Sequence, residues 1–150
     1  MSEAREFTIT RVFNAPRELV FKAWTEPAQL AAWYGPRGTS TPVESIEVDL
    51  RQGGRWRARM IRDDNGTEFP VGGVFRQVAE PERLVFTWAL DTAGSESLVT
   101  ITFADHGDKT EMTFHQAGFA TGSESTGVAD GWLSAFERLT DHFIDKEEDR

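Results

Sequence analysis

The chain has 150 residues, 39% of them hydrophobic and 27% charged, and it contains no cysteine. These values are typical of one globular domain that folds without a structural metal, and they exclude a disulfide framework, a thiolate nucleophile and a cysteine metal site. The net charge of −9 opposes binding to nucleic acid and anionic membranes. We therefore expect a single domain over residues 1–150, and a cytoplasmic one, because neither a signal peptide nor a membrane span is present.

The N-terminal part of the chain changes its pattern several times. Residues 7–13 alternate in polarity and predict a strand. Residues 14–16, Asn-Ala-Pro, then indicate a helix start capped by the asparagine. Helical spacing continues to Trp24, and a second short helix is expected from Pro27. The glycines and prolines of residues 34–42 predict a loop.

From residue 43 to residue 117 the polarity alternates with a period of two, which predicts strands joined by hairpins. The last segment returns to helical spacing, with apolar residues at Val128, Trp132, Phe136, Leu139 and Phe143. An antiparallel sheet with an apolar face needs a cover, and the terminal helix is the only element long enough to provide it. We therefore predict an α+β fold: a curved antiparallel sheet of about seven strands wrapped around a long C-terminal helix, with two short helices after the first strand.

The register of the first hairpin can be chosen by separating apolar from charged residues. A three-residue loop over 52–54 places apolar side chains on one face and opposite charges on the other, with Gly54 in the left-handed conformation. The arginines of this face then have acidic partners, which favours a solvated surface over a phosphate site. The predicted pairs are Leu50–Trp56, Val48–Ala58, Ile46–Met60, Asp49–Arg57 and Glu47–Arg59.

The later hairpins are treated in the same way. A loop over 106–109 pairs Phe103 with Met112, Ile101 with Phe114 and Val99 with Gln116. The strand after Pro81 has an ambiguous partner, and we favour Phe75 opposite Phe86 and Gly73 opposite Trp88, with the glycine making room for the indole. Asp63 and Asp64, beside Asn65-Gly66, predict a turn. On the inward face Gln116 is the polar exception, and its amide must meet either a protein group or a bound molecule.

Four ordered motifs resemble the homologues of the activator of heat-shock protein 90 ATPase. They are residues 14–24 followed by Pro27, Leu30 and Trp33, residues 49–56, residues 82–88, and Gly131-Trp132. The resemblance covers nearly the whole chain. It places the chain in the START-like (SRPBCC) superfamily with polyketide cyclases and birch-pollen-allergen-like proteins, and implies a helix-grip fold with a cavity between sheet and terminal helix.

Two departures from the family pattern affect what the resemblance implies. Many relatives carry histidine at the position of Gln116, and an amide does not titrate, so a proton-transfer role for this position is weakened. The eukaryotic activator also has a separate amino-terminal chaperone-binding domain, for which a chain of 150 residues has no room. A chaperone partner is therefore doubtful despite the family name.

The inward aromatic residues can be plain core, but as a group with one polar handle they have the usual composition of a small-molecule pocket. The candidate ligand-binding residues are Trp33, Trp56, Met60, Phe75, Trp88, Phe103, Met112, Phe114, Gln116, Trp132 and Phe136. Gly131 adds to this interpretation, because glycine inside a helix costs about 1 kcal/mol relative to alanine and should allow close approach of a strand, loop or ligand.

Catalytic and metal-binding residues are not assigned. The three histidines, His106, His115 and His142, share no metal-ligand spacing, and no cofactor is expected. The leading hypothesis is a binding protein for a small hydrophobic or aromatic molecule. Two alternatives stay open: a cyclase- or hydratase-type enzyme using the same cavity, and a protein-interaction domain with a filled core. The expected partner is a small hydrophobic molecule, not nucleic acid or a membrane, and a homodimer stays open.

Overall fold

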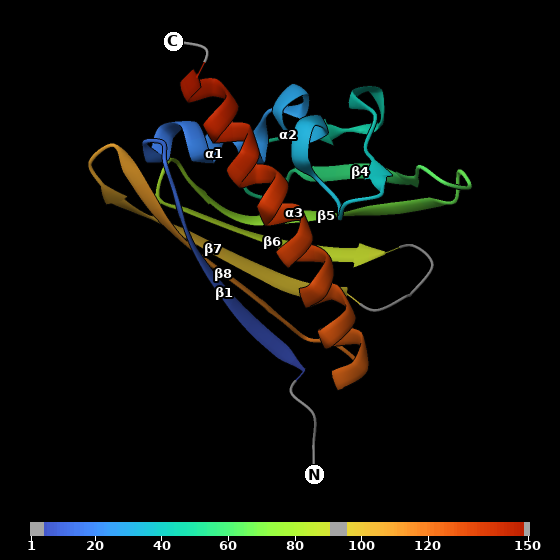
Figure 1. Cartoon of the computed structure of the whole chain (residues 1–150). Coiled ribbons are helices and arrows are strands. Elements are labelled where there is room, and N and C mark those ends of the chain that lie inside the picture. The colour runs from blue at the N-terminus through green and yellow to red at the C-terminus, as the bar shows by residue number, and fades with distance from the viewer. Residues whose placement is uncertain (1–4, 91–95, 149–150) are drawn as a thin grey trace.

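The computed structural model describes residues 5–90 and 96–148, and only the backbone of residues 144–148. The elements follow the predicted order of strand, two short helices, strands and long helix (Figure 1). Their bounds are β1 Glu6–Phe13, α1 Arg17–Thr25, α2 Pro27–Trp33, β2 Thr39–Ser40, a 3-10 turn Val43–Ser45, β3 Glu47–Val48, β4 Arg55–Arg62, β5 Glu68–Ala79, β6 Arg83–Leu90, β7 Glu96–His106, β8 Lys109–Ala117 and α3 Gly122–Glu148. The α+β class is confirmed.

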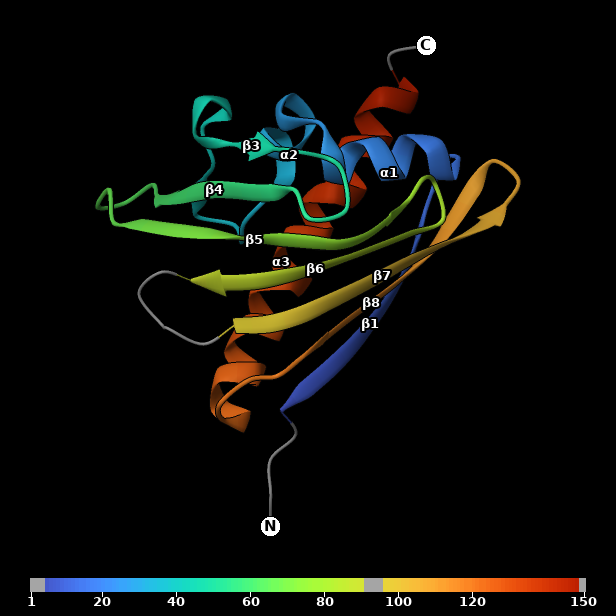
Figure 2. The same cartoon turned by 180° about the vertical axis from the view of Figure 1, so that it is seen from behind.

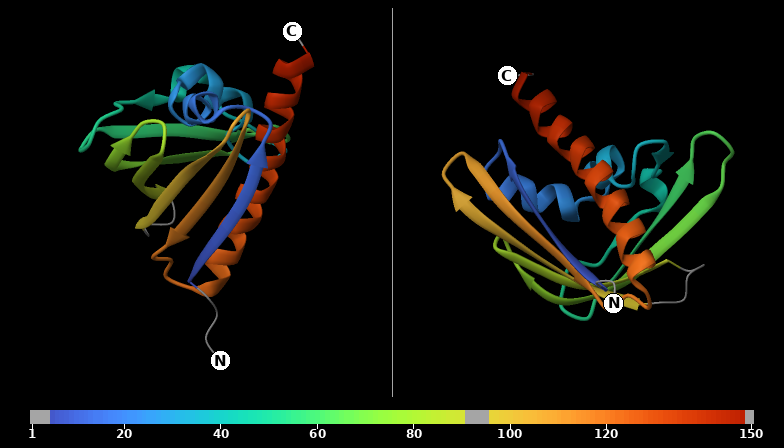
Figure 3. Two further views of the ribbon diagram at one scale, coloured as in Figure 1. Left: turned by 90° about the vertical axis from the view of Figure 1, so that its left-hand side faces the viewer. Right: turned by 60° about the horizontal axis from the view of Figure 1, so that its bottom comes forward.

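The described strands form one antiparallel sheet in the order β1-β8-β7-β6-β5-β4-β2, with β3 paired to β4. The sheet curls, and α3 crosses its concave face, as the right-hand view of Figure 3 shows. From behind, no helix covers the convex face (Figure 2). This is the helix-grip arrangement that the sequence predicts. No helix in the described part of the chain is long and apolar enough to cross a membrane.

The two short helices fill one part of the concave face with aromatic side chains. Trp24 of α1 packs its ring against Trp33 of α2 at 4.8 Å, and against Phe114 and Phe136 at 5.9 and 6.0 Å. The Trp33 indole donates a hydrogen bond to the carbonyl of Ala23 (3.0 Å), which ties α2 to α1. Helix α1 begins after Pro16 without a side-chain cap, so the predicted cap by the preceding asparagine is wrong.

The hairpin before β4 differs from the predicted register. Val48 lies opposite Trp56, so the pairing of Leu50 with Trp56, and the pairs derived from it, are wrong by two residues. A shift of two residues equals the side-chain period of a strand, so each strand residue stays on the face predicted for it. Leu50, however, falls in the turn and is 37% exposed. The cause is a distant strand, because the turn exchanges backbone hydrogen bonds with Phe75 of β5 in addition to its own bond from the Gly54 N–H to the carbonyl of Arg51.

The shifted register also changes the charge partners. Arg57 pairs with Glu47 (2.6 Å), and Arg59 pairs across to Glu68 of β5 (3.3 Å). The expectation of a solvated face with matched charges therefore holds, although the partners differ from those predicted. Exposed pairs of this kind contribute little to stability.

The other hairpin predictions agree more closely with the structure. The predicted pairs of β7 and β8 are confirmed. The turn between them is shorter than predicted, because His106 already lies opposite Lys109. Phe75 lies opposite Phe86 as expected. Gly73 makes room for backbone and not for an indole, since a Cβ there would lie 1.8 Å from the carbonyl oxygen of Thr87.

A chain of buried hydrogen bonds joins α3 to the sheet. The Trp132 indole donates to Gln116 Oε1 (2.8 Å), and Gln116 Nε2 donates to Ser97 Oγ (2.8 Å). Ser97 Oγ donates in turn to the carbonyl of Trp88 (3.1 Å). Gln116 is fully buried, and both ends of its amide have protein partners, so it needs no bound molecule to satisfy it.

We expect Gly54→Ala to lower the free energy of unfolding by roughly 1–3 kcal/mol. The reason is steric, because a Cβ at Gly54 would lie 2.1 Å from the carbonyl oxygen of Asp49. The left-handed position is Gly53 (φ 84°), where a Cβ meets nothing within 4 Å and asparagine is tolerated. Gly53→Asn is therefore the control, and urea unfolding of both variants makes the comparison. Equal stabilities of the two variants would contradict this account of the turn.

We also expect Gln116→Leu to lower the free energy of unfolding by roughly 1–3 kcal/mol, because it leaves the buried Trp132 N–H without an acceptor. In a Trp132→Phe background the same substitution should cost less, since the stranded donor is gone. Denaturant unfolding of the four proteins measures this coupling. An equal cost in both backgrounds would show that the hydrogen bond does not hold α3.

Candidate functional site

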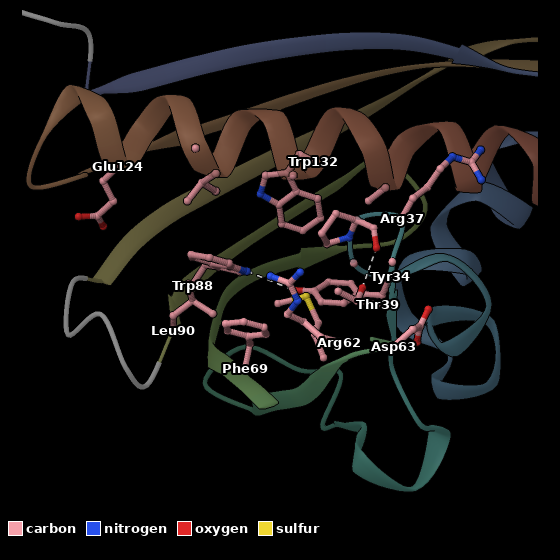
Figure 4. Close-up of a pocket in the computed structure, with 18 of the residues that line it drawn as sticks. Tyr34, Arg37, Thr39, Arg62, Asp63, Phe69, Trp88, Leu90, Glu124 and Trp132 are labelled. Carbon is pink, nitrogen blue, oxygen red and sulfur yellow. Dashed lines mark hydrogen bonds between the residues drawn. The ribbon is translucent and has the colours of Figure 1, made fainter. Parts of the chain in front are cut away.

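A cavity of about 610 Å³ lies between the N-terminal half of α3, strands β4 to β6 and the segment after α2 (Figure 4). The aromatic side chains of α1 and α2 do not reach this part of the concave face. The lining residues are Tyr34, Gly35, Pro36, Arg37, Gly38, Thr39, Met60, Arg62, Asp63, Asp64, Phe69, Trp88, Leu90, Ser123, Glu124, Gly127, Val128, Gly131, Trp132 and Ala135.

The cavity has an open and a closed end along α3. Gly127 is exposed, Gly131 is half-buried, and Ala135, one turn further, is buried. The opening therefore lies toward the N-terminus of α3, and the closed end lies near Ala135. The buried residues of the lining define this closed end: Tyr34, Gly35, Trp88, Trp132 and Ala135.

The two glycines of α3 face empty space. A Cβ built on Gly127 or Gly131 would meet nothing within 4 Å. The sequence allowed three close neighbours for Gly131: a strand, a loop or a ligand. No described strand or loop lies that close to it. Both glycines make the cavity wider than any other residue would, at a cost of about 1 kcal/mol of helix propensity each.

The segment 35–39 forms the wall of the cavity opposite the sheet. Side chains of α3 bind this segment. Arg138 donates from Nη1 to the carbonyl of Gly35 (2.9 Å), with longer contacts to the carbonyls of Pro36 and Thr39. Burial, and secondarily the charge of Arg37, lower the pKa of Arg138, although a guanidinium stays protonated at neutral pH. The carbonyl of Pro36 also accepts from the backbone N–H and hydroxyl of Thr39, whereas Arg138 is the donor to the carbonyl of Gly35.

Arg37 also joins the segment 35–39 to α3, on its solvent-exposed side. Its backbone N–H donates to Ser134 Oγ (2.9 Å), and its guanidinium pairs with Asp141 (3.0 Å) and Glu137 (3.4 Å). The bonds to Asp141 and then Glu137 raise the pKa of Arg37. Because this side chain is exposed, the ion pairs are screened by solvent and contribute less than the Arg138 contacts.

The Tyr34 hydroxyl is the polar group of the closed end. It accepts a hydrogen bond from the Trp88 indole N–H (3.1 Å), drawn as a dashed line in Figure 4. Burial raises the pKa of the Tyr34 phenol above its ordinary value, against a smaller lowering by the Trp88 bond. The hydroxyl therefore keeps its proton over the physiological pH range and can donate it to an acceptor.

The charged residues of the lining lie toward solvent: Arg37, Arg62, Asp63 and Asp64 are exposed, and Glu124 near the N-terminus of α3 is half-buried. Arg62 pairs with Asp64 (3.0 Å), and Asp63 accepts a hydrogen bond from Ser40 Oγ (2.6 Å). The predicted turn that contains these two aspartates is thus part of the cavity opening. Among the described residues no group of three or more histidines and carboxylates is arranged to hold a metal ion.

The structure separates the sequence-predicted site residues into three sets. Met60, Trp88 and Trp132 line the cavity. Trp56 and Phe75 line a second space of about 30 Å³, beside Trp24. The others lie in the packed core, outside both linings: Trp33, Phe103, Met112, Phe114, Gln116 and Phe136. They are core because α1 and α2 bring aromatic rings against them.

Sequence reasoning missed the wall 35–39, Tyr34 and the strand-end residues Phe69 and Leu90. A loop has no periodicity from which side-chain direction follows, so its residues could not be assigned to a face. One signal was available: Tyr34 is the single tyrosine of the chain, and it stands directly before the glycine- and proline-rich segment.

The comparisons with known proteins agree with this architecture. A protein from Chromobacterium violaceum has a similar solved structure, with a TM-score of 0.85, 25% sequence identity, and coverage of 93% of this chain and 96% of that chain. The AHSA1 protein of Silicibacter pomeroyi superposes with a TM-score of 0.84 at 23% identity, covering 94% of this chain and 99% of that one. A comparison with curated proteins finds no significant match.

The family description that matches is "Activator of Hsp90 ATPase homolog 1-like protein", over residues 14–143. This range includes both short helices, the whole sheet after β1 and most of α3. It therefore includes every residue that lines the cavity. The chain belongs to the family of activator of Hsp90 ATPase homolog 1-like proteins.

Proposed function

We propose that the protein binds a small hydrophobic molecule in the cavity between α3 and the sheet. The observation that carries the proposal is the cavity itself, whose volume of about 610 Å³ lies within the range of roughly 300–1,000 Å³ usual for small-molecule sites. Protein interiors are otherwise closely packed, so an apolar space of this size needs an explanation. A ligand that fills it supplies one.

The composition of the lining supports an apolar ligand. Trp88, Trp132 and Phe69 provide aromatic surfaces, and Met60 and Leu90 provide aliphatic ones. Burying apolar ligand surface against them is favourable by about 25 cal/mol per Å². The glycines of α3 support the same proposal, because they widen the cavity at the expense of helix stability.

The carboxylates and the histidines offer little support for the enzyme alternative. Asp63 and Asp64 are exposed at the rim, Glu124 is half-buried near the open end, and none of the buried lining residues is a carboxylate or histidine. A general base needs to reach the reacting atoms. A binding role is therefore the function that the geometry supports best, and a cytoplasmic location stays part of the proposal.

Gly131→Leu should weaken ligand binding strongly while keeping the fold. The leucine side chain enters the cavity, and overpacking of this kind costs about 1–3 kcal/mol, or about tenfold or more in affinity. Leucine also has the better helix propensity, by about 0.8 kcal/mol, so the free energy of unfolding should not fall. Binding is measured by the fluorescence increase of N-phenyl-1-naphthylamine, a neutral apolar probe, and stability by urea unfolding.

Asp130→Leu is the matched control, because it adds the same side chain at the preceding position, which is exposed and outside the cavity lining. It should leave probe affinity unchanged. Native mass spectrometry of freshly purified protein adds a search for a retained molecule. The proposal fails if the probe does not bind to the wild-type protein, or if both leucine variants bind it as the wild type does.

A further inference from the structure

One polar hydrogen at the closed end of the cavity has no acceptor. The Tyr34 side chain is 4% exposed and accepts the hydrogen bond of Trp88, yet no described residue accepts the proton of its own hydroxyl. A buried hydroxyl without an acceptor loses about 1–3 kcal/mol that it would recover by donating. The Trp88 bond also polarises the hydroxyl and makes it a stronger donor.

The other side-chain donors among the buried lining residues are already used. Trp88 donates to Tyr34, and Trp132 donates to Gln116. The backbone carbonyl of Gly35 is occupied by Arg138. Among the buried lining residues, the closed end therefore offers a ligand one available side-chain hydrogen-bond donor, beside two indole rings whose centroids lie 6.4 Å apart.

The same end opposes an ionised ligand group. The buried lining residues carry no charge, while Arg62, Asp63 and Asp64 are exposed and Glu124 is half-buried toward the opening. Arg62, at the rim, is already paired with Asp64. A carboxylate placed beside Tyr34 would lose its hydration without gaining a cation, which is strongly unfavourable. A neutral acceptor such as a carbonyl oxygen loses much less.

We propose that the cavity selects a neutral aromatic molecule with a carbonyl-type oxygen, which accepts the hydrogen bond of Tyr34 at the closed end. This inference rests on the proposed function and adds the chemical class of the ligand. Trp88 acts as a positioning residue, since its N–H fixes the hydroxyl rotamer that directs the proton toward the cavity. Indole faces favour a flat aromatic body over a branched aliphatic one.

Three naphthalenes of similar shape test the inference: 2-acetylnaphthalene, 2-ethylnaphthalene and 2-naphthoate. Affinities are measured by displacement of N-phenyl-1-naphthylamine from the wild-type protein and variants. The quantity compared is the preference ratio, the affinity for the ketone divided by that for the hydrocarbon. The naphthoate should bind most weakly of the three at neutral pH.

The decisive variant is Tyr34→Phe/Trp88→Phe, because in Tyr34→Phe alone the freed indole N–H could donate to the ketone. The preference ratio of the double variant should fall about fivefold or more below the wild-type ratio, the effect of one hydrogen bond. Trp88→Phe alone keeps the hydroxyl and is the matched control. Its affinity for both compounds falls with the smaller aromatic surface, and its preference ratio lies between those of the wild type and the double variant, because the hydroxyl still donates but is no longer oriented by the indole N–H.

The outcomes separate the two proposals. If the ethyl and acetyl compounds bind but the ratio is the same in the double variant, the role of Tyr34 is wrong and the binding function stands. If the probe binds to the wild type but neither compound displaces it, the inference falls and the binding function stands; if the probe itself does not bind, both proposals fall. Should the double variant not fold, the carbonyl stretching frequency of 2-acetylnaphthalene bound to the wild type decides: it should lie below the value in hexane, and an unshifted frequency rejects the inference.

Discussion

The hydrogen bond from Trp132 to Gln116 sets the orientation of α3 on the sheet. An indole N–H buried in an aromatic core needs an acceptor, and Gln116 of β8 is the one it reaches, at 2.8 Å. Successive residues of a helix are 100° apart, so fixing Trp132 also fixes the directions of Gly131 and Ala135. With α3 in this rotation, its small residues Gly127, Gly131 and Ala135 line the cavity beside Trp132.

The size of the covering side chains decides which part of the interior is filled. Beside α1 and α2, rings such as those of Trp24 and Trp33 pack at 4.8 Å between centroids and leave only the space of about 30 Å³. Beyond the end of α2, the chain continues as Gly35-Pro36-Arg37-Gly38-Thr39, whose small residues cannot fill the remaining volume and whose arginine turns outward to α3. One curled sheet thus has a packed part and an open part.

The sequence predicted the fold well where the pattern is local. The β7–β8 hairpin has a short turn and strict alternation, and its register followed from the sequence. The turn before β4 failed because Phe75, about twenty residues away, supplies its backbone partners. For the site, the strand residues Met60 and Trp88 and the helix residue Trp132 could be found, since periodicity gives their direction. Tyr34 and the wall after it could not, because tertiary contacts with α3 alone determine where that segment lies.

The way in which the wall is held has an evolutionary consequence. Arg138 grips the main-chain carbonyls of Gly35, Pro36 and Thr39, and main-chain carbonyls are common to all amino acids. Wall residues other than Gly35 and Gly38, whose φ angles are positive, can therefore be exchanged over generations without loss of these hydrogen bonds, provided that the backbone path is kept. Such exchanges remodel the cavity while the aromatic core stays untouched, so that one scaffold can diversify toward new ligands in small steps without passing through unfolded intermediates.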